Sequence, residues 1–251
     1  MRLDQGGHLT HGSPANFLSK VYQFDFYGVN QETETIDYEA LEKKAKEFQP
    51  KLIIEGGSSY PRMIDYERIG AIAKSVGAFS MVDMAHVSGL IAAKVIPSPV
   101  PYADFVSSST TKTFCGPRSG MVLCKKEFAK QLDRGVFPGA LGSMHLHTMA
   151  AKAWCFKQMA GAEYRATMTQ VVKNAKKLAE ELAKYPGAEV VWVQDEPRNQ
   201  GAWPHLALNL FAQWPRPVRL VSRPESATTA AGRPSLHQEQ ASRLLRAAFG
   251  D

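Results

Sequence analysis

The sequence predicts an α/β fold with a mostly parallel central sheet, followed by a small carboxy-terminal α/β segment. Between Val21 and Cys124, short β-rich runs alternate with amphipathic helical runs, which is the pattern of βα units. Seventeen lysines lie at or before Lys184 and none after it, whereas seven arginines follow it. Because the composition changes at this point, we expect two domains, residues 1–184 and residues 185–251.

Local signals place the elements of the first domain. Asp37 is a suitable cap for a helix over residues 37–45. The stretch from Tyr66 to Val76 predicts a helix with Ile69 and Ile72 on one apolar face, ending at Gly77, which suits a left-handed cap. The β-rich runs predict strands at residues 21–27, 51–55, 79–84, 104–110 and 121–124.

The rest of the chain is expected to hold two further sets of elements. A long helical stretch from Leu146 to Lys184 is interrupted near Gly161. Beyond the composition change, the pattern predicts two strands, a turn between them and a closing helix. These four elements are expected at residues 189–194, 218–222, 195–201 and 236–249, respectively.

Composition narrows the class of protein. The chain has 251 residues, of which 44% are hydrophobic and 22% charged, as in soluble globular proteins. Its apolar runs end after a few residues, too soon to cross a bilayer, and its first residues lack the apolar stretch of a secretory signal. We therefore expect no membrane segment and no export.

Cysteine usage and charge indicate a cytoplasmic protein that does not bind nucleic acid. Cys115, Cys124 and Cys155 are an odd number without CxxC spacing, which argues against a disulfide framework and against a zinc site. The net charge is +6, but lysines alternate with glutamates along the helical stretches, which is typical of solvated helix faces. The positive charge is therefore not interpreted as a nucleic-acid surface.

Three residues at strand ends could carry chemistry. Asp83 ends one predicted strand, His86 follows it, and Lys112 lies just after a later strand. Because parallel sheets bind ligands beyond the carboxyl ends of their strands, these residues would face one crevice. A lysine forms a Schiff base with an aldehyde, and a carboxylate keeps a pyridine nitrogen protonated. Taken singly, the aspartate could also be a turn residue and the lysine an exposed one.

No metal site is expected. His8 and His11 have the i, i+3 spacing of a helix and His145 and His147 form an HxH pair, but neither pair has a third ligand at a suitable spacing. Cys115 lies close to the candidate lysine and is interpreted as a small packing residue rather than a nucleophile.

Four sequence blocks closely resemble those of serine hydroxymethyltransferases, which use pyridoxal 5′-phosphate. The blocks occur in the same order and with similar spacing, and the helices between them also match. The resemblance covers residues 1–184, as an internal fragment of the family's large domain. The four blocks are Gly6–Ser13, Val82–Gly89, Thr110–Gly120 and Phe137–Ser143.

The resemblance implies a fold and a reaction. The fold would be the aspartate-aminotransferase-like domain of fold type I. The activity would be that of a glycine hydroxymethyltransferase, which interconverts serine plus tetrahydrofolate with glycine plus 5,10-methylenetetrahydrofolate. By the same resemblance Lys112 forms the Schiff base with the cofactor and Asp83 pairs with its pyridine nitrogen. His8 would stack on the ring, and His86 and Ser58 would approach its phenolic oxygen.

The resemblance also implies partners. Leu3, Gly7 and Leu9 correspond to a wall that contacts the folate. Gly142 corresponds to a loop that reaches the cofactor phosphate of a neighbouring subunit, so a homodimer is implied. Another enzyme of the same fold type, such as an aldolase, is a weaker alternative because the Gly-Gly-His-Leu-Thr-His block specifically suggests the folate enzyme.

Three departures from the family pattern favour a second hypothesis. Thr111 stands where the family usually has a histidine before the lysine. The family's preceding segment, with its phosphate loop, and its carboxy-terminal domain, with the arginine that binds the substrate carboxylate, are expected to be absent. The alternative is therefore a catalytically incomplete product that acts as a cofactor-binding or subunit-interaction fragment.

Residues after about 186 resemble a different family, the first component of 2-oxoglutarate dehydrogenase, which depends on thiamine diphosphate. The match is to the extreme carboxyl end of that protein, which does not hold the thiamine site, so no thiamine chemistry is implied here. A fusion near residue 185 accounts for both resemblances. The matching blocks are Glu189–Trp203, Arg223–Gly232 and Leu236–Gln238.

Overall fold

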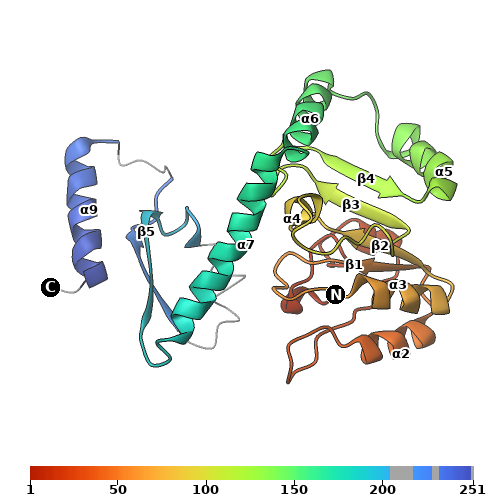
Figure 1. Ribbon diagram of the computed structural model, residues 1–251, viewed down its shortest axis with the longest axis horizontal. Coiled ribbons are helices and arrows are strands. Elements are labelled where there is room, and N and C mark those ends of the chain that lie inside the picture. The colour runs from red at the N-terminus through yellow and green to blue at the C-terminus, as the bar shows by residue number, and fades with distance from the viewer. Residues whose placement is uncertain (204–216, 228–231, 250–251) are drawn as a thin grey trace. The chain divides into compact units, whose positions relative to one another are not determined.

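The computed structural model describes residues 1–203, 217–227 and 232–249, and the chain divides into two units, Met1–Ala179 and Glu180–Asp251. A four-stranded sheet lies at the centre of the first unit, in the order β1-β2-β3-β4 (Figure 1). The first three strands are parallel and β4 is antiparallel to β3, so the mostly parallel sheet is confirmed. The strands are β1 (Leu52–Glu55), β2 (Phe79–Asp83), β3 (Phe105–Ser109) and β4 (Gly120–Cys124).

The helices α2 (Tyr38–Phe48) and α3 (Tyr66–Ser75) begin at the capping signals that predict them. The Asp37 carboxylate accepts the amide of Ala40 at 2.9 Å, which satisfies one of the free N–H groups at the start of α2. After α3 the chain turns at Gly77, whose φ of +69° lies in the left-handed region. Helix α3 packs on β1 and β2, and α2 packs on α3.

Two hydrophobic clusters hold the first unit together. One joins Ile53 of β1 to Ile69 and Ile72 of α3, and Ile69 is 0% exposed. The other joins Val82 of β2 to residues of β3, α4 and α6. Burying a side chain the size of isoleucine contributes roughly 1.5–3 kcal/mol. The apolar face predicted for residues 66–76 is therefore the face that packs against the sheet.

The remaining helices of the first unit are short, apart from the last two. Helices α6 and α7 are separated at Gly161, as the sequence predicts. Within the part of the chain that the structure describes, no helix has both the length and the apolar character needed to cross a membrane. The bounds are η1 (Leu3–Gln5), α1 (Leu18–Val21), α4 (Ser88–Ala92), η2 (Lys126–Phe128), α5 (Ala129–Arg134), η3 (Gly135–Ala140), α6 (Leu146–Met159) and α7 (Ala162–Ala183).

The strand predicted at residues 21–27 is wrong. Helix α1 ends at Val21, and the extended segment after it forms only an isolated bridge between Val29 and Ile36. The backbone of Tyr27 bonds instead to the start of the chain, since its carbonyl accepts the amide of Arg2 at 2.9 Å. A β-rich run becomes a strand only where a neighbouring strand completes its ladder of hydrogen bonds.

The second unit contains a pair of parallel strands, β5 (Val190–Pro197) and β6 (Val218–Arg223), and the helix α9 (Pro234–Phe249), which packs on both. Both predicted strands and the closing helix are confirmed. Strand β5 runs three residues beyond the expected 194, so the turn starts at Arg198. The Gln194 side-chain amide donates to the carbonyl of Gln200 at 2.9 Å and so holds this turn. Residues 228–231 of the second carboxy-terminal block lie outside the described residues.

We predict that limited proteolysis will cut the chain first at the exposed segment from Ala183 to Glu189, because this segment follows α7 and precedes β5. Trypsin should cleave first after Lys184 and release a fragment of residues 1–184, followed over time by electrophoresis and mass spectrometry. The Lys184→Gln variant should lose this early cut. A first cut after Lys173 or Lys177, inside α7, would contradict a domain boundary near residue 184.

Candidate functional site

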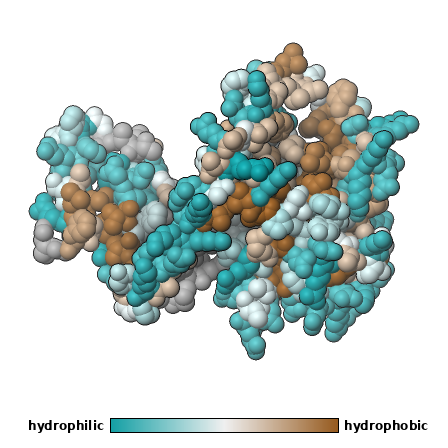
Figure 2. Space-filling view, viewed as in Figure 1, coloured by the Kyte–Doolittle hydropathy of each residue, from teal (hydrophilic) through white to brown (hydrophobic). Residues whose placement is uncertain are grey.

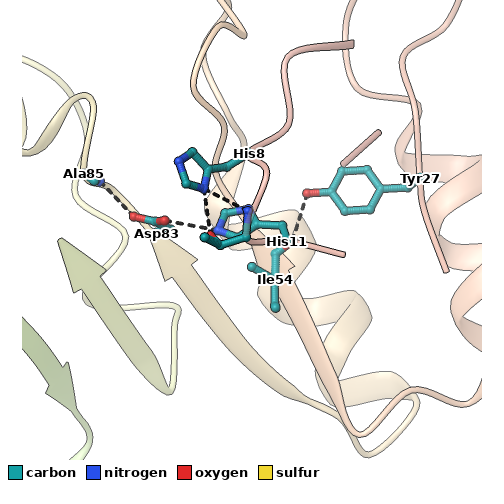
Figure 3. Close-up of polar contacts among 7 residues, drawn as sticks. His8, His11, Tyr27, Ile54, Asp83 and Ala85 are labelled. Carbon is teal, nitrogen blue, oxygen red and sulfur yellow. Dashed lines mark hydrogen bonds and ion pairs between the residues drawn. The ribbon is translucent and has the colours of Figure 1, made fainter. Parts of the chain in front are cut away.

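The carboxyl ends of the three parallel strands meet at one edge of the sheet, and Asp83 is the last residue of β2. Its carboxylate lies between two donors (Figure 3). The ring Nε2 of His11 is 3.1 Å from Oδ2, and the amide of Ala85 donates to Oδ1 at 3.1 Å. His11 is 72 positions away in the sequence, so the fold brings this pair together.

Hydrogen bonding keeps the Asp83 carboxyl ionised. Burial raises its pKa, but the hydrogen bonds from His11 and from the amide of Ala85 outweigh burial and hold the pKa below its usual value. The side chain is still 22% exposed. The carboxylate is therefore a fixed negative charge with room for one more donor, such as a protonated ring nitrogen.

His8 lies beside this pair. Its ring centroid is 5.4 Å from that of His11 and 6.4 Å from that of His86, both tilted. Burial lowers the pKa of His8, and repulsion from His11 and Lys112 lowers it further against the opposing effect of Asp83. The imidazole is therefore neutral near pH 7, a form that suits stacking on a ring better than pairing with an anion.

A glycine-rich contact fixes the His8 loop against the end of β1. The carbonyl of Gly6 accepts the amide of Ser58 at 2.9 Å, and a Cβ added at Gly57 would lie 2.4 Å from that same carbonyl. Gly56 has φ +106°, and a Cβ there would lie 2.1 Å from the carbonyl oxygen of Asp83. The structure thus brings Ser58 and His8 to the same strand ends as Asp83.

Lys112 lies in a closed loop that follows β3. Thr110, which is 0% exposed, closes this loop through its hydroxyl group, which donates to the carbonyl of Ser119 at 3.1 Å. Its amide donates to the same carbonyl at 2.9 Å. The loop between them is therefore held at its base. The positive charge of Lys112 makes a smaller contribution than burial to lowering the pKa of His8.

Two further contacts hold the Lys112 loop from outside. The hydroxyl oxygen of Thr113 accepts the amide of Gly89, near the start of α4, at 2.8 Å. The phenol of Tyr164 on α7 donates to the carbonyl of Thr113 at 2.6 Å. The residue after the candidate lysine is thus tied to two helices, which limits how far the lysine backbone moves.

The other predicted residues are less closely grouped. Leu3 and Leu9 are 50% and 56% exposed, whereas Gly7 is buried. A pocket of about 350 Å³ has Leu3, His8 and His11 in its wall. Gly142 lies in an exposed segment after η3, where an added Cβ would meet no atom within 4 Å.

Sequence reasoning missed His11. The i, i+3 spacing of His8 and His11 lacks the third ligand of a metal site and predicts no other role for His11, whereas the structure directs its ring toward Asp83 (Figure 3). The Nδ1 atom of the same ring is buried and has no hydrogen-bond partner among the described residues. Nε2 is therefore the ring atom of His11 through which the carboxylate of Asp83 accepts a hydrogen bond.

Comparison with known protein families gives two matches. The family model described as serine hydroxymethyltransferase matches residues 1–194. The model described as the 2-oxoglutarate dehydrogenase C-terminal domain matches residues 172–249. The first match includes every residue of the site described above, and the second includes the whole of β5, β6 and α9. Both resemblances seen in the sequence are therefore confirmed.

Proposed function

Because the chain belongs to the serine hydroxymethyltransferase family, we propose that its first unit binds pyridoxal 5′-phosphate through Lys112 and serves the transfer of a hydroxymethyl group between serine and tetrahydrofolate. The observation that carries this proposal is the Asp83–His11 pair beside His8, at the strand ends that Lys112 follows. The aspartate-aminotransferase-like arrangement of fold type I belongs to the same proposal.

The donor set fits this cofactor. A carboxylate that is kept ionised and still partly exposed suits a protonated pyridine nitrogen, and Asp83 has both properties. The neutral imidazole of His8 suits the face of an aromatic ring. When bound, the cofactor supplies an electron-withdrawing ring that stabilises negative charge at the substrate's α-carbon.

The site residues have separate roles in this proposal. Asp83 holds the pyridine nitrogen protonated, and His11 fixes the position of the carboxylate. His8 limits ring tilt, so that the bond to be broken stays aligned with the ring's π-system. His86 and Ser58 stand near the phenolic oxygen. Leu3, Gly7 and Leu9 form the wall for the folate.

A second candidate function is that of a catalytically incomplete fragment that binds the cofactor or another subunit. Two observations favour it. Thr111 precedes Lys112 where the family usually has histidine, and residues 172–249 match a different family model. The substrate-binding part of the family's carboxy-terminal domain therefore has no counterpart in that stretch.

One pair of measurements separates the two candidates. The purified chain is titrated with pyridoxal phosphate while the absorbance of a protonated Schiff base is followed, and glycine formation from serine is then assayed with tetrahydrofolate present. A band with turnover supports the enzyme, and a band without turnover supports the fragment. If neither band nor turnover appears, the enzyme and the cofactor-binding fragment are both wrong, and only a subunit-interaction fragment is left.

We also propose that the first unit forms a homodimer. The segment from η3 to the start of α6 exposes large apolar side chains, and Figure 2 shows hydrophobic residues on the surface near α5 and α6. Gly142 lies within this segment, next to the surface that a second copy would cover. Sedimentation velocity over a range of concentrations tests it, with a purely monomeric chain as the contrary result. The exposed side chains are Phe137, Leu141, Met144 and Leu146, at 61–80%.

We predict that His11→Ala weakens binding of pyridoxal phosphate by roughly tenfold to a hundredfold, since a hydrogen bond to a charged group contributes about 1.5–3 kcal/mol. Without His11, burial raises the pKa of Asp83, and the carboxylate holds the pyridine nitrogen less well. The measurement is the dissociation constant from fluorescence titration. His147→Ala, which removes an exposed histidine, is the control and should leave binding unchanged. If the two substitutions change the dissociation constant equally, His11 has no role in cofactor binding.

A further inference from the structure

Cys155 of α6 lies against the backbone on both sides of Cys115. Its buried thiol donates to the carbonyl oxygen of Phe114 at 3.1 Å. On the other side, a Cβ added at Gly116 would lie 2.9 Å from Sγ of Cys155 and 3.4 Å from its Cβ. The two cysteines are therefore neighbours in the fold, although 39 residues separate them in the sequence.

Peptide geometry limits the distance between them. The Cα of Cys115 follows the carbonyl oxygen of Phe114 by about 2.8 Å, so it lies within about 6 Å of Sγ of Cys155. A disulfide requires Cα atoms about 4.4–6.8 Å apart. The limit of about 6 Å is measured to Sγ of Cys155 rather than to its Cα, so the two sulfur atoms would join through rotation of the Cys115 side chain together with a shift of the loop that brings the two Cα atoms into this range.

The two thiols differ in how they meet a reagent from solution. Cys115 is exposed and has φ +59°, a left-handed conformation that strains a residue other than glycine. Cys155 is buried, and burial raises the pKa of its thiol. Cys115 is thus the thiol that an oxidant reaches first, and Cys155 lies where it can attack the oxidised sulfur of Cys115.

We propose that Cys115 and Cys155 form a disulfide when the chain meets a peroxide, and that this bond ties the Lys112 loop to α6. The Cys115 thiolate attacks one peroxide oxygen, which gives a sulfenic acid and releases hydroxide that is protonated to water. The Cys155 sulfur then attacks the sulfenic sulfur and expels a second water. Two thiols and one hydrogen peroxide thus become one disulfide and two waters, and a dithiol reductant reverses the change.

A disulfide between Cys115 and Cys155 would restrict the loop that carries Lys112. Cys115 lies three residues after Lys112, and its amide donates to the carbonyl of Lys112 at 2.9 Å. The neighbouring Thr113 is already held by Tyr164. A covalent link to α6 would fix this side of the loop and slow the backbone motions that let Lys112 approach and leave a ligand. Formation of the disulfide needs no bound cofactor.

Trypsin provides a direct test, because each of the three cysteines falls in a different peptide. These peptides are residues 113–118 with Cys115, 119–125 with Cys124, and 153–157 with Cys155. After brief treatment with hydrogen peroxide and blocking of free thiols, mass spectrometry of the wild-type chain should find 113–118 joined to 153–157 in most molecules. Dithiothreitol should remove the joined peptide.

Three variants and one further measurement sharpen the test. Cys115→Ser and Cys155→Ser should each abolish the joined peptide, whereas Cys124→Ser, the matched control on β4, should retain it. Hydrogen exchange at the amides of residues 113–119 should slow by about tenfold in the oxidised chain. The proposal is overturned if oxidation stops at sulfenic or higher acids of Cys115, joins two chains through Cys115, or links Cys124 instead. The wild-type peptide map decides even if Cys155→Ser fails to fold.

Discussion

Replacing Lys112 by alanine is expected to lower covalent retention of pyridoxal phosphate by about a hundredfold or more, because only a primary amine in the site forms the Schiff base. The measurement is borohydride reduction of the chain with bound cofactor, followed by tryptic mass spectrometry. Trypsin does not cut after a modified lysine, so labelled wild-type chain should yield a joined peptide of residues 95–118 that carries the cofactor.

The control for this experiment is Lys126→Ala, which removes an exposed lysine from η2 and should leave labelling of the site intact. Asp83→Asn, which removes the negative charge but keeps the shape of the side chain, should leave the label on Lys112 but weaken binding. If reduction labels several of the exposed lysines as strongly as Lys112, the cofactor assignment is wrong. Retention of the label in the Lys112→Ala variant would also show that the cofactor assignment is wrong.

Replacing Glu55 by glutamine is expected to stabilise the first unit at alkaline pH. Glu55 ends β1 and is 0% exposed. Its Oε1 accepts the hydroxyl of Ser80 at 2.6 Å, and its Oε2 has no hydrogen-bond partner among the described residues. Burial raises the pKa of Glu55 to about 8, and repulsion from Asp65 adds to this against the hydrogen bond from Ser80.

The sign of the pH dependence follows from these two pKa values. In the unfolded chain the pKa of Glu55 is 4.5, and in the folded chain it is about 8. Between these values the unfolded chain releases a proton that the folded chain keeps, so the free energy of unfolding falls as pH rises. The loss from this residue begins near pH 4.5, is complete above pH 8, and totals about 5 kcal/mol. A domain's whole stability is only about 5–15 kcal/mol.

Glutamine keeps the size and the acceptor oxygen of Glu55 but has no proton to lose. The variant should therefore match the wild type at low pH and exceed it by several kcal/mol at about pH 9. Urea unfolding followed by circular dichroism at several pH values measures the difference. Glu47→Gln, at an exposed position of α2, is the matched control and should leave the pH slope unchanged. A Glu55→Gln slope identical to that of the wild type would show that Glu55 is ionised in the folded chain.

The elements that the sequence predicts correctly are those whose signals are local. Asp37 caps α2 through its own side chain, and Gly77 turns the chain after α3 through its own backbone freedom. The spacing of Ile69 and Ile72 predicts the buried face of α3 from the period of a helix alone. Such signals act within a few residues, so they can be read before any tertiary contact is known.

The errors have the opposite cause. Residues 21–27 have the composition of a strand, but whether they form one depends on a neighbour that composition does not reveal. Likewise, the residues of β4 alone do not reveal that this strand runs antiparallel to β3. In the candidate site, Asp83 and Lys112 are predictable as strand-end residues, whereas the His11 contact depends on a distant part of the chain.

Gly56 has a consequence for how this sequence can vary over evolution. Its φ of +106° and the 2.1 Å approach of the Asp83 carbonyl exclude every side chain, although the residue has no chemical group of its own to offer. A substitution there would push apart β1 and β2 at the end that carries the aspartate. Random mutagenesis with selection for the folded site should therefore return glycine at position 56 as strictly as it returns aspartate at position 83. Selection for the folded site would therefore also conserve a residue that contributes no side chain to it.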